Sequence, residues 1–197
     1  LKYSSEFYSI GLTSDGNGEA GNEVGVWLLA GANNHIGGSS AASRNVISGN
    51  FHAGVIVGRP DGWKHKVKSE DPGDERCVGS VIEGNWIGLD ATGARAQPNG
   101  RTFRLEGLGL LIGRFSAETI LGGTTVGRRN VVAGNEGPGV IVDAIDGSRH
   151  ALWGNFVGLS PDAAYGIANR GPGLIVRGDP LLLVGGYGTG EANTFTD

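Results

Sequence analysis

Two kinds of sequence block alternate along this chain of 197 residues, and the repetition limits its possible folds more than any other feature. The first block reads "WIGLDATGARAQPN" in its middle copy and occurs without a gap at 9–22, 86–99 and 156–169. The second reads "GGTTVGRRNVVAGNEGPGVIV" at 122–142 and occurs also at 37–57, with its first half at 185–195. Repetition on this scale predicts stacked units, each of which buries its apolar side against its neighbours.

Three short apolar runs follow one another in each unit. The first run is a glycine followed by apolar, variable and apolar positions, and it occurs at 25–28, 54–57, 109–112, 139–142 and 173–176. No segment has the apolar spacing of a helix, and the 38 glycines, against an ordinary share of about 7%, suit many tight turns. We therefore predict an all-β chain: one right-handed, single-stranded parallel β-helix (a solenoid) of about five coils with three parallel sheets. It would span residues 1–197 as a single domain, with a loop insertion at about 59–76.

Asparagine recurs at one position of the third run. Each of these asparagines stands two residues before an apolar residue that we expect to face the core: Asn45, Asn85, Asn130, Asn155 and Asn193. Stacked about 4.8 Å apart, each side-chain amide is able to donate to one neighbour and accept from the other. We therefore predict an inward asparagine ladder at one corner of the coils.

The segments "GGTTVGRRNVVAGN" and "GNFVGLSPDA" resemble the repeats of large secreted bacterial and algal proteins that form right-handed parallel β-helices. The resemblance covers nearly the whole chain apart from 59–76, and it implies an extracellular protein. The same architecture occurs in pectate and alginate lyases, epimerases, phage tailspikes, adhesin stalks and some carbohydrate-binding modules, so it does not select a function.

The outward positions of the first sheet are all apolar: Trp27, Ile56, Leu111, Ile141 and Ile175. Such a ladder is a poor place to abstract a proton or hold a metal, and no Ser-His-Asp, Cys-His or zinc-type spacing occurs. We therefore expect no catalytic residues. The ladder is either an exposed patch through which copies associate in a fibre or adhesin, or it is covered by long loops or the insertion. A polysaccharide lyase or C5-epimerase that uses the Lys/His-rich insertion is a further alternative.

Outward aromatic residues of the third sheet suggest a sugar platform. Trp86 and Phe156 are two coils apart, roughly 10 Å, which is close to the spacing of alternate sugars in a β-1,4-linked glycan. Trp153, Trp63 and Tyr187 extend this set of ligand-binding residues, and the alternative is that the rings cover neighbouring strands. The leading prediction is a non-catalytic module that binds a plant or algal cell-wall polysaccharide as part of a larger secreted protein, beside neighbouring domains.

Charge and composition exclude other classes. The net charge is −4 with no basic tract, which disfavours nucleic acid, and no apolar run is long enough to span a membrane. Cys77 is alone, so no internal disulfide is possible. We expect no cofactor or metal; the oxygen-bearing residues Asp15, Asn17 and Glu19 weakly suggest calcium, although a turn explains them better. Asp90 likewise reads as a turn residue, since other copies have Thr13 and Ser160 there.

Overall fold

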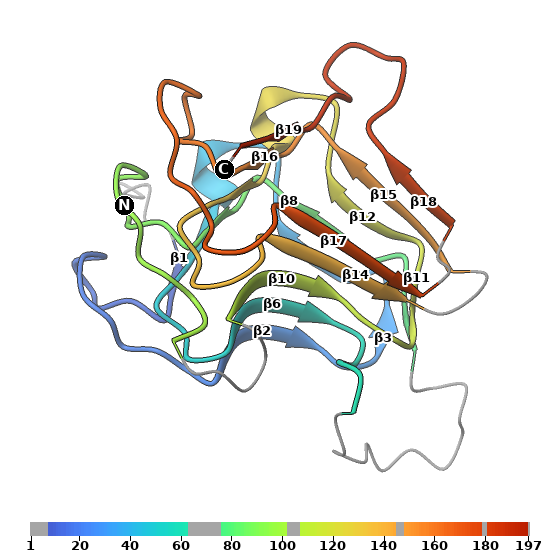
Figure 1. Cartoon of the computed structure of the whole chain (residues 1–197), viewed down its shortest axis with the longest axis horizontal. Coiled ribbons are helices and arrows are strands. Elements are labelled where there is room, and N and C mark those ends of the chain that lie inside the picture. The colour runs from blue at the N-terminus through green and yellow to red at the C-terminus, as the bar shows by residue number, and fades with distance from the viewer. Residues whose placement is uncertain (1–7, 63–75, 102–106, 145–147, 179–180, 197) are drawn as a thin grey trace, which may run out of the picture.

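The computed structural model describes residues 8–62, 76–101, 107–144, 148–178 and 181–196, and its regular structure is almost entirely parallel β-sheet (Figure 1). The first sheet contains β2 (Val24–Leu28), β6 (Ala53–Val57), β10 (Leu108–Ile112), β14 (Val140–Ala144) and β17 (Leu174–Gly178). The second contains β4 (His35–Gly37), β8 (Val81–Glu83), β12 (Thr119–Gly122), β15 (Arg149–Trp153) and β18 (Leu181–Val184). The third contains β1 (Tyr8–Ile10), β5 (Asn45–Ile47), β9 (Trp86–Ile87), β13 (Val131–Val132), β16 (Phe156–Val157) and β19 (Thr194–Phe195).

A fourth, shorter sheet was not predicted. It contains β3 (Gly31–Ala32), β7 (Cys77–Val78) and β11 (Ser116–Ala117). The chain is extended for two residues between the first and second sheets in three successive repeats, and these residues pair with one another. The three expected sheets are therefore four in the part of the chain that the structure describes. Two short 3-10 turns, η1 (Ala41–Ser43) and η4 (Val126–Arg128), precede third-sheet strands.

The chain visits the sheets in the same order in each repeat. It passes from the first sheet through the second to the third and then returns to the first, so that strands far apart in sequence become neighbours. All neighbouring strands in the four sheets are parallel. Figure 1 shows the first sheet as a stack of strands in chain order, from β2 to β17. Parallel strands joined this way direct one side chain in two into the interior, which explains the alternating apolar runs.

Side chains from all four sheets meet in one apolar core. The core contains, among others, Val55 of the first sheet, Ile82 and Leu121 of the second and Ile47 of the third, all fully buried. Each apolar run of the sequence thus contributes to a common interior. Among the described residues, no helix is long and apolar enough to cross a membrane.

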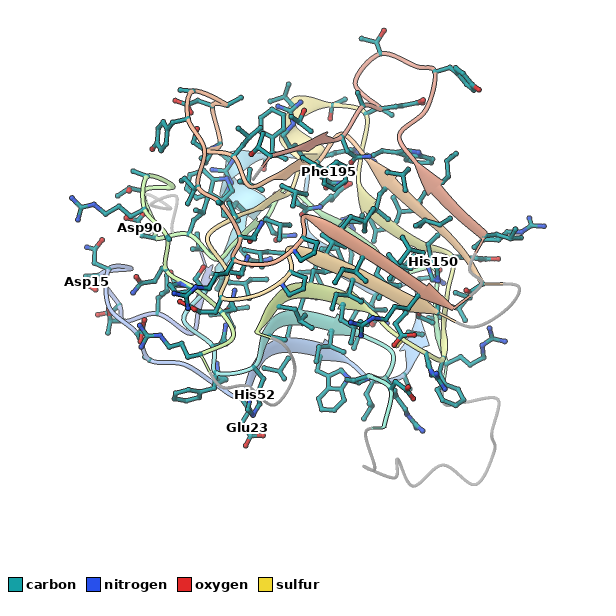
Figure 2. The ribbon with its side chains drawn as sticks, in the orientation of Figure 1. Asp15, Glu23, His52, Asp90, His150 and Phe195 are labelled. Atoms are coloured by element: carbon teal, nitrogen blue, oxygen red, sulfur yellow. The ribbon has the colours of Figure 1, made fainter. Side chains whose placement is uncertain are left out.

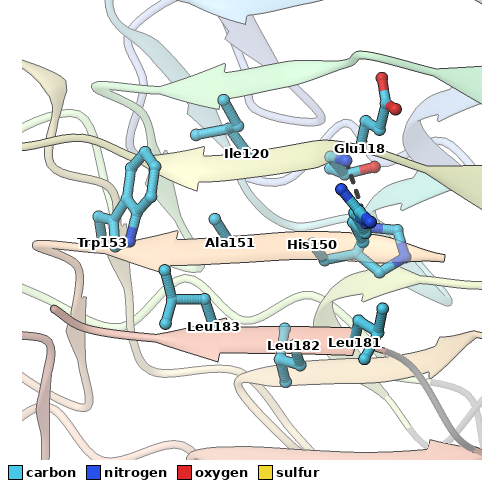
Figure 3. Close-up of a pocket in the computed structure, with 10 residues that line it drawn as sticks. Glu118, Ile120, His150, Ala151, Trp153, Leu181, Leu182 and Leu183 are labelled. Carbon is cyan, nitrogen blue, oxygen red and sulfur yellow. Dashed lines mark hydrogen bonds between the residues drawn. The ribbon is translucent and has the colours of Figure 1, made fainter. Parts of the chain in front are cut away.

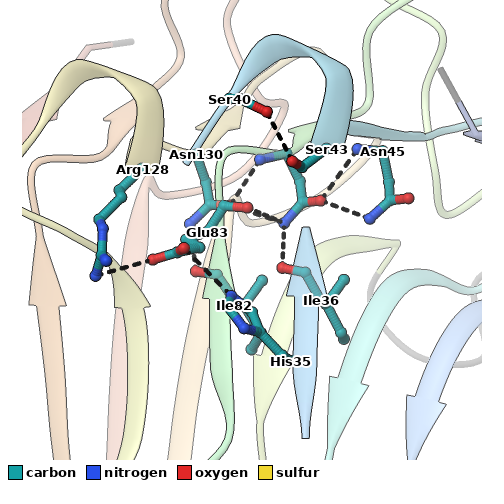
Figure 4. Close-up of polar contacts among 10 residues, drawn as sticks. His35, Ile36, Ser40, Ser43, Asn45, Ile82, Glu83, Arg128 and Asn130 are labelled. Atoms are coloured by element: carbon teal, nitrogen blue, oxygen red, sulfur yellow. Dashed lines mark hydrogen bonds and ion pairs between the residues drawn. The ribbon is translucent and has the colours of Figure 1, made fainter. Parts of the chain in front are cut away.

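The predicted asparagine ladder is confirmed (Figure 4). The side-chain amide of each asparagine donates to the Oδ1 of the next, at 2.9 Å from Asn45 to Asn85, 3.1 Å to Asn130, 3.0 Å to Asn155 and 2.9 Å to Asn193. The same amides also donate to backbone carbonyls, as Asn130 does to Ile82 at 2.8 Å. The side-chain amides of the ladder are therefore satisfied from repeat to repeat.

A second asparagine ladder was missed by the sequence reasoning. Its members donate in the same direction, at 3.4, 2.9, 3.0 and 2.9 Å along the series Asn22, Asn50, Asn99, Asn135 and Asn169. The signal was present, because copies of both blocks contain these asparagines directly after a glycine or a loop residue. The two ladders lie on either side of the third-sheet strands and fix where each strand begins and ends.

The outward ladder of the first sheet is not an exposed patch. Ile56, Leu111 and Ile141 are 0, 4 and 2% exposed, and only Trp27 and Ile175 at the two ends of the ladder are half-buried. These side chains pack in a second apolar cluster outside the main core. Because buried residues offer no surface to another molecule, self-association through this ladder is wrong, and its burial favours the alternative of a covered ladder.

Candidate ligand-binding groove

A groove of about 540 Å³ runs over the outward side of the second sheet (Figure 3). Its floor is formed by Ile120 of β12, Ala151 of β15 and Leu183 of β18, which are register partners on adjacent strands. Ala151 is the smallest of the three and lies between the two larger side chains, so the surface is hollowed there. The neighbouring residues Leu121 and Leu152 face the core, as the alternation of a strand requires.

Trp153 forms a wall of the groove at the end of β15. Figure 3 shows its ring on the same side of the strands as Ile120, Ala151 and Leu183. The indole Nε1–H is shielded from solvent and has no hydrogen-bond partner in the described part of the chain. The ring is therefore held by packing alone. The sequence predicted Trp153 as outward and ligand-binding, and the structure gives it an outward position.

Charged side chains stand at the other end of the groove. Glu118 precedes β12 and Arg149 begins β15, and both are exposed. Leu181, which is 59% exposed, lines the same end from β18. The groove therefore combines an apolar floor and an aromatic wall with one polar end, which is the composition of many small-molecule and sugar sites.

The groove site was not foreseen as a whole, because its floor lies in the second sheet. The alternation of "ETILGG", "HALWGN" and "LLLVGG" contains the signal, since each has an apolar residue at an outward position. What the sequence does not reveal is that these three positions are adjacent on an uncovered face.

Trp86 and Phe156 lie on the third sheet with Val131 between them, as the sequence predicted. They do not present bare rings. The guanidinium carbon of Arg44 lies 4.2 Å from the Trp86 ring centroid, and that of Arg129 lies 3.8 Å from the Phe156 centroid. Both rings are half-buried and pack with Val131 in a small apolar cluster. These contacts favour the alternative that the rings cover neighbouring strands.

Each arginine comes from the repeat before the ring that it covers. Arg44 and Arg129 directly precede asparagines of the first ladder, and burial lowers the pKa of both guanidinium groups. Arg129 also donates from Nε to the carbonyl of Gly154 at 2.8 Å. The stacked cation and ring are worth about 0.5–2 kcal/mol in such settings, so these pairs join successive repeats.

The other two predicted site residues do not join the groove. Tyr187 is fully exposed in the loop between β18 and β19. Trp63 lies outside the described residues, as does most of the insertion predicted at about 59–76.

The oxygen-bearing residues of the first block form turns. Asp15 accepts hydrogen bonds from the Thr13 hydroxyl and from the Asn17 N–H, and the first of these is the main cause of its lowered pKa. Glu19 pairs with Arg101. Among the described residues, no three His, Cys, Asp or Glu side chains gather as metal ligands. The carboxylates of Asp15 and Glu19, two of the three suggested calcium ligands, therefore bind protein partners here.

Equivalent turns in the other two copies use the same chemistry, and the order of hydroxyl and carboxylate is reversed only in the middle copy. There the loop of Asp90 lies beside the loop of Asp15 (Figure 2). Thr92 donates to Asp90 at 2.8 Å, and Ser160 donates to Asp162 at 2.6 Å. Asp90 also accepts from the backbone N–H of Ala94 at 3.1 Å. A hydroxyl and a carboxylate two residues apart thus close each loop, which confirms that Asp90 is a turn residue.

Glu83 is a buried carboxylate that the sequence analysis missed (Figure 4). Its two oxygens lie 3.2 Å from His35 Nε2 and 3.4 Å from Arg128 Nη1, and the partners come from the repeats on either side. Glu83 and Trp153 both directly precede a Gly-Asn pair at the end of a second-sheet strand. At one of these positions the side chain ties repeats together, and at the other it borders the groove.

Comparisons with protein-family models, curated proteins and solved structures find no match to this chain. The resemblance of its blocks to secreted β-helix repeats therefore stays a prediction from the sequence.

Proposed function

We propose that the chain is a right-handed parallel β-helix that binds a polysaccharide in the groove of the second sheet. The solenoid is supported by the repeated order in which the chain visits its parallel sheets and by two asparagine ladders that continue through successive repeats. A stack of this kind presents flat, elongated faces, which suit an extended ligand better than a compact one.

One observation carries the binding proposal: Trp153 borders an apolar groove that the fold itself does not need. A sugar ring has apolar C–H faces that pack against an indole ring, and hydroxyl groups that hydrogen-bond to charged side chains such as Glu118 and Arg149. The volume of about 540 Å³ fits within the usual range of ligand sites, roughly 300–1,000 Å³. The ligand that we propose for this groove is the one predicted from the sequence, a polysaccharide of plant or algal cell walls, and the resemblance of the repeats implies only that the protein is extracellular.

Affinity electrophoresis tests this proposal. The wild-type chain should be retarded in gels that contain one or more polysaccharides from a panel of neutral and acidic β-glycans. Trp153→Ala should migrate as it does in a gel without polysaccharide, because the aromatic wall is gone. Tyr8→Ala is the matched control, since it removes an exposed aromatic ring from β1 in another sheet. Equal retardation of Trp153→Ala and wild type would show that the groove is not the binding site.

A structural role in a fibre is the second candidate, and the last strands favour it. Val176, Val184 and Phe195 are register partners of core residues, yet they are 49, 44 and 39% exposed, because β17, β18 and β19 are edge strands among the described residues. We expect a second copy of the chain to cover these side chains if the protein assembles. Sedimentation velocity should then show a concentration-dependent dimer that Val176→Asp abolishes. A monomer at high concentration would contradict this role and leave the groove proposal intact.

The lyase or epimerase alternative rests on Lys64, His65, Lys66 and Lys68. These residues lie outside the described part of the chain. Release of unsaturated products from alginate or pectate would support a lyase over simple binding, and inversion at C5 without chain cleavage would support an epimerase.

A further inference from the structure

Four polar side chains share one register position at the start of successive second-sheet strands. Thr119 pairs with His150. Val81 pairs with His35 on one side and with Ile120 on the other, and Ile120 pairs with Ala151. The residues directly before these four are therefore aligned as well. The aligned series is Asn34, Ser80, Thr119 and His150. Each stands two residues before a side chain of the apolar core, so strand alternation directs the whole series inward. We call this series the polar column.

Every member of the polar column has a buried polar atom without a partner in the described part of the chain. These atoms are Asn34 Nδ2, Ser80 Oγ, Thr119 Oγ1 and His150 Nε2. Ser80 and Thr119 are 0% exposed and His150 is 4% exposed, so bulk water does not reach them. A buried polar group that makes no hydrogen bond destabilises a fold, and four in consecutive repeats are too many to be incidental.

The state of His150 defines the donors of the column. Its Nδ1 accepts a hydrogen bond from the Thr119 N–H at 3.2 Å, so the proton of the neutral ring is on Nε2. The column therefore offers N–H donors at both ends and two hydroxyls, able to donate or accept, between them. No fixed charge in the column favours an ion: donors repel a cation, and a neutral imidazole does not attract an anion.

Strand spacing explains why the column members do not bond to one another. Parallel strands lie about 4.8 Å apart, which is longer than a hydrogen bond of about 2.8–3.2 Å. An asparagine amide reaches far enough to close this distance, as both ladders show, whereas a serine or threonine hydroxyl does not. A water molecule about 2.8 Å from each of two groups about 4.8 Å apart makes an angle near 120°, close to the tetrahedral preference of water.

We propose that a single file of water molecules bridges Asn34, Ser80, Thr119 and His150 inside the stack of repeats. The file replaces the direct bonds of the asparagine ladders at a corner where the side chains are too short. It gives each of these atoms a hydrogen-bond partner, with a water molecule on either side of the Ser80 and Thr119 hydroxyls, and it continues through the repeats as the ladders do. This inference does not depend on the proposed binding function.

A crystal structure at about 1.5 Å resolution or better tests the water file directly, since buried water bound by several partners is well ordered. We expect electron density within hydrogen-bond distance of both Ser80 Oγ and Thr119 Oγ1, and of both Thr119 Oγ1 and His150 Nε2. Absence of density at both positions would overturn the proposal.

Thermal unfolding of Thr119→Val provides a second test, because the two side chains have nearly the same shape. If water bridges the hydroxyl, its loss leaves waters underbonded, and Tm should fall by about 2–4 °C. If the buried hydroxyl has no hydrogen-bond partner, neither protein nor water, its removal should leave Tm unchanged or raise it. That result would also overturn the proposal. Thr125→Val is the control, because Thr125 is exposed and its side chain makes no capping bond.

Discussion

The two sides of the second sheet differ in how far the fold explains them. Leu121 and Leu152 face inward and are buried in the common core, as any stacked parallel sheet requires. Ile120, Ala151 and Leu183 face outward on the same strands and are also apolar, and Leu183 is 52% exposed. Packing accounts for the inward side only. The apolar outward side is the surface that the proposed binding function uses.

The outward side of the third sheet gives the contrast. There the aromatic rings are shielded by Arg44 and Arg129 and take part in joining the repeats. The rings on the third sheet are therefore part of the packing between repeats, whereas Trp153 on the second sheet borders a groove.

Truncating one leucine on each side of the second sheet should give the largest difference in stability between the two sides. Leu152→Ala removes a fully packed core side chain, and we expect the free energy of unfolding to fall by about 2–5 kcal/mol. Leu183→Ala, on the outward side of the adjacent strand, should cost less than about 1 kcal/mol because that side chain is already half in solvent. Urea denaturation measures both. Equal losses would mean that the groove is part of the structural core.

Acid titration tests the inward side at His150. Burial lowers the pKa of His150 from its ordinary value of 6.5 to about 4, so the unfolded chain binds a proton more readily than the folded one between these values. Stability contributed by the neutral ring should be full above pH 6.5 and should be lost as the pH falls towards 4, by about 3 kcal/mol in total.

His150→Leu isolates this contribution from the other histidines. Leu182 occupies the same register position in β18, so a leucine suits the column at this point. Chemical denaturation between pH 7 and 4 should show a smaller loss of stability in the variant than in wild type. The same loss in both proteins would contradict a buried neutral His150.

A substitution that fills the groove tests whether the outward side of the second sheet binds polysaccharide. Ala151→Leu places a larger side chain on the floor between Ile120 and Leu183, and it should weaken polysaccharide binding at least about tenfold, or about 1.4 kcal/mol. Thermal unfolding should change little, because the side chain extends away from the core. Unchanged retention in affinity gels, with an unchanged fold by circular dichroism, would remove Ala151 from the site.

Arg129→Ala should have a small effect on stability and none on binding. It removes the contact with Phe156 and the hydrogen bond to Gly154, and we expect a loss of about 1 kcal/mol in unfolding free energy. Polysaccharide retention should not fall, because Arg129 does not line the groove. A loss of retention without a loss of stability would move the binding site to the third sheet.

Much of the parallel sheet structure was predictable because the repeat brings equivalent residues into register. The position of Asn45, Asn85 and Asn130 relative to inward apolar residues was enough to predict the first ladder. The second ladder follows the same rule, but the loops that precede Asn99 and Asn169 hid the equivalence with Asn50.

Contacts between repeats were harder to predict. The burial of Ile56 and the stacking of Arg129 on Phe156 depend on which side chains of neighbouring repeats reach a given face, and spacing along one chain does not specify that. Trp153 was identifiable as an outward aromatic residue. Its groove was not, since the hollow exists only because Ala151 separates two larger side chains from other strands.

A crystal structure of the chain with an oligosaccharide, taken from a polysaccharide that retards it in gels, is the most direct test of the groove. The binding proposal predicts density for a sugar ring packed against Trp153, above Ala151 and between Ile120 and Leu183. Sugar bound over Trp86 and Phe156 with the groove empty would contradict it.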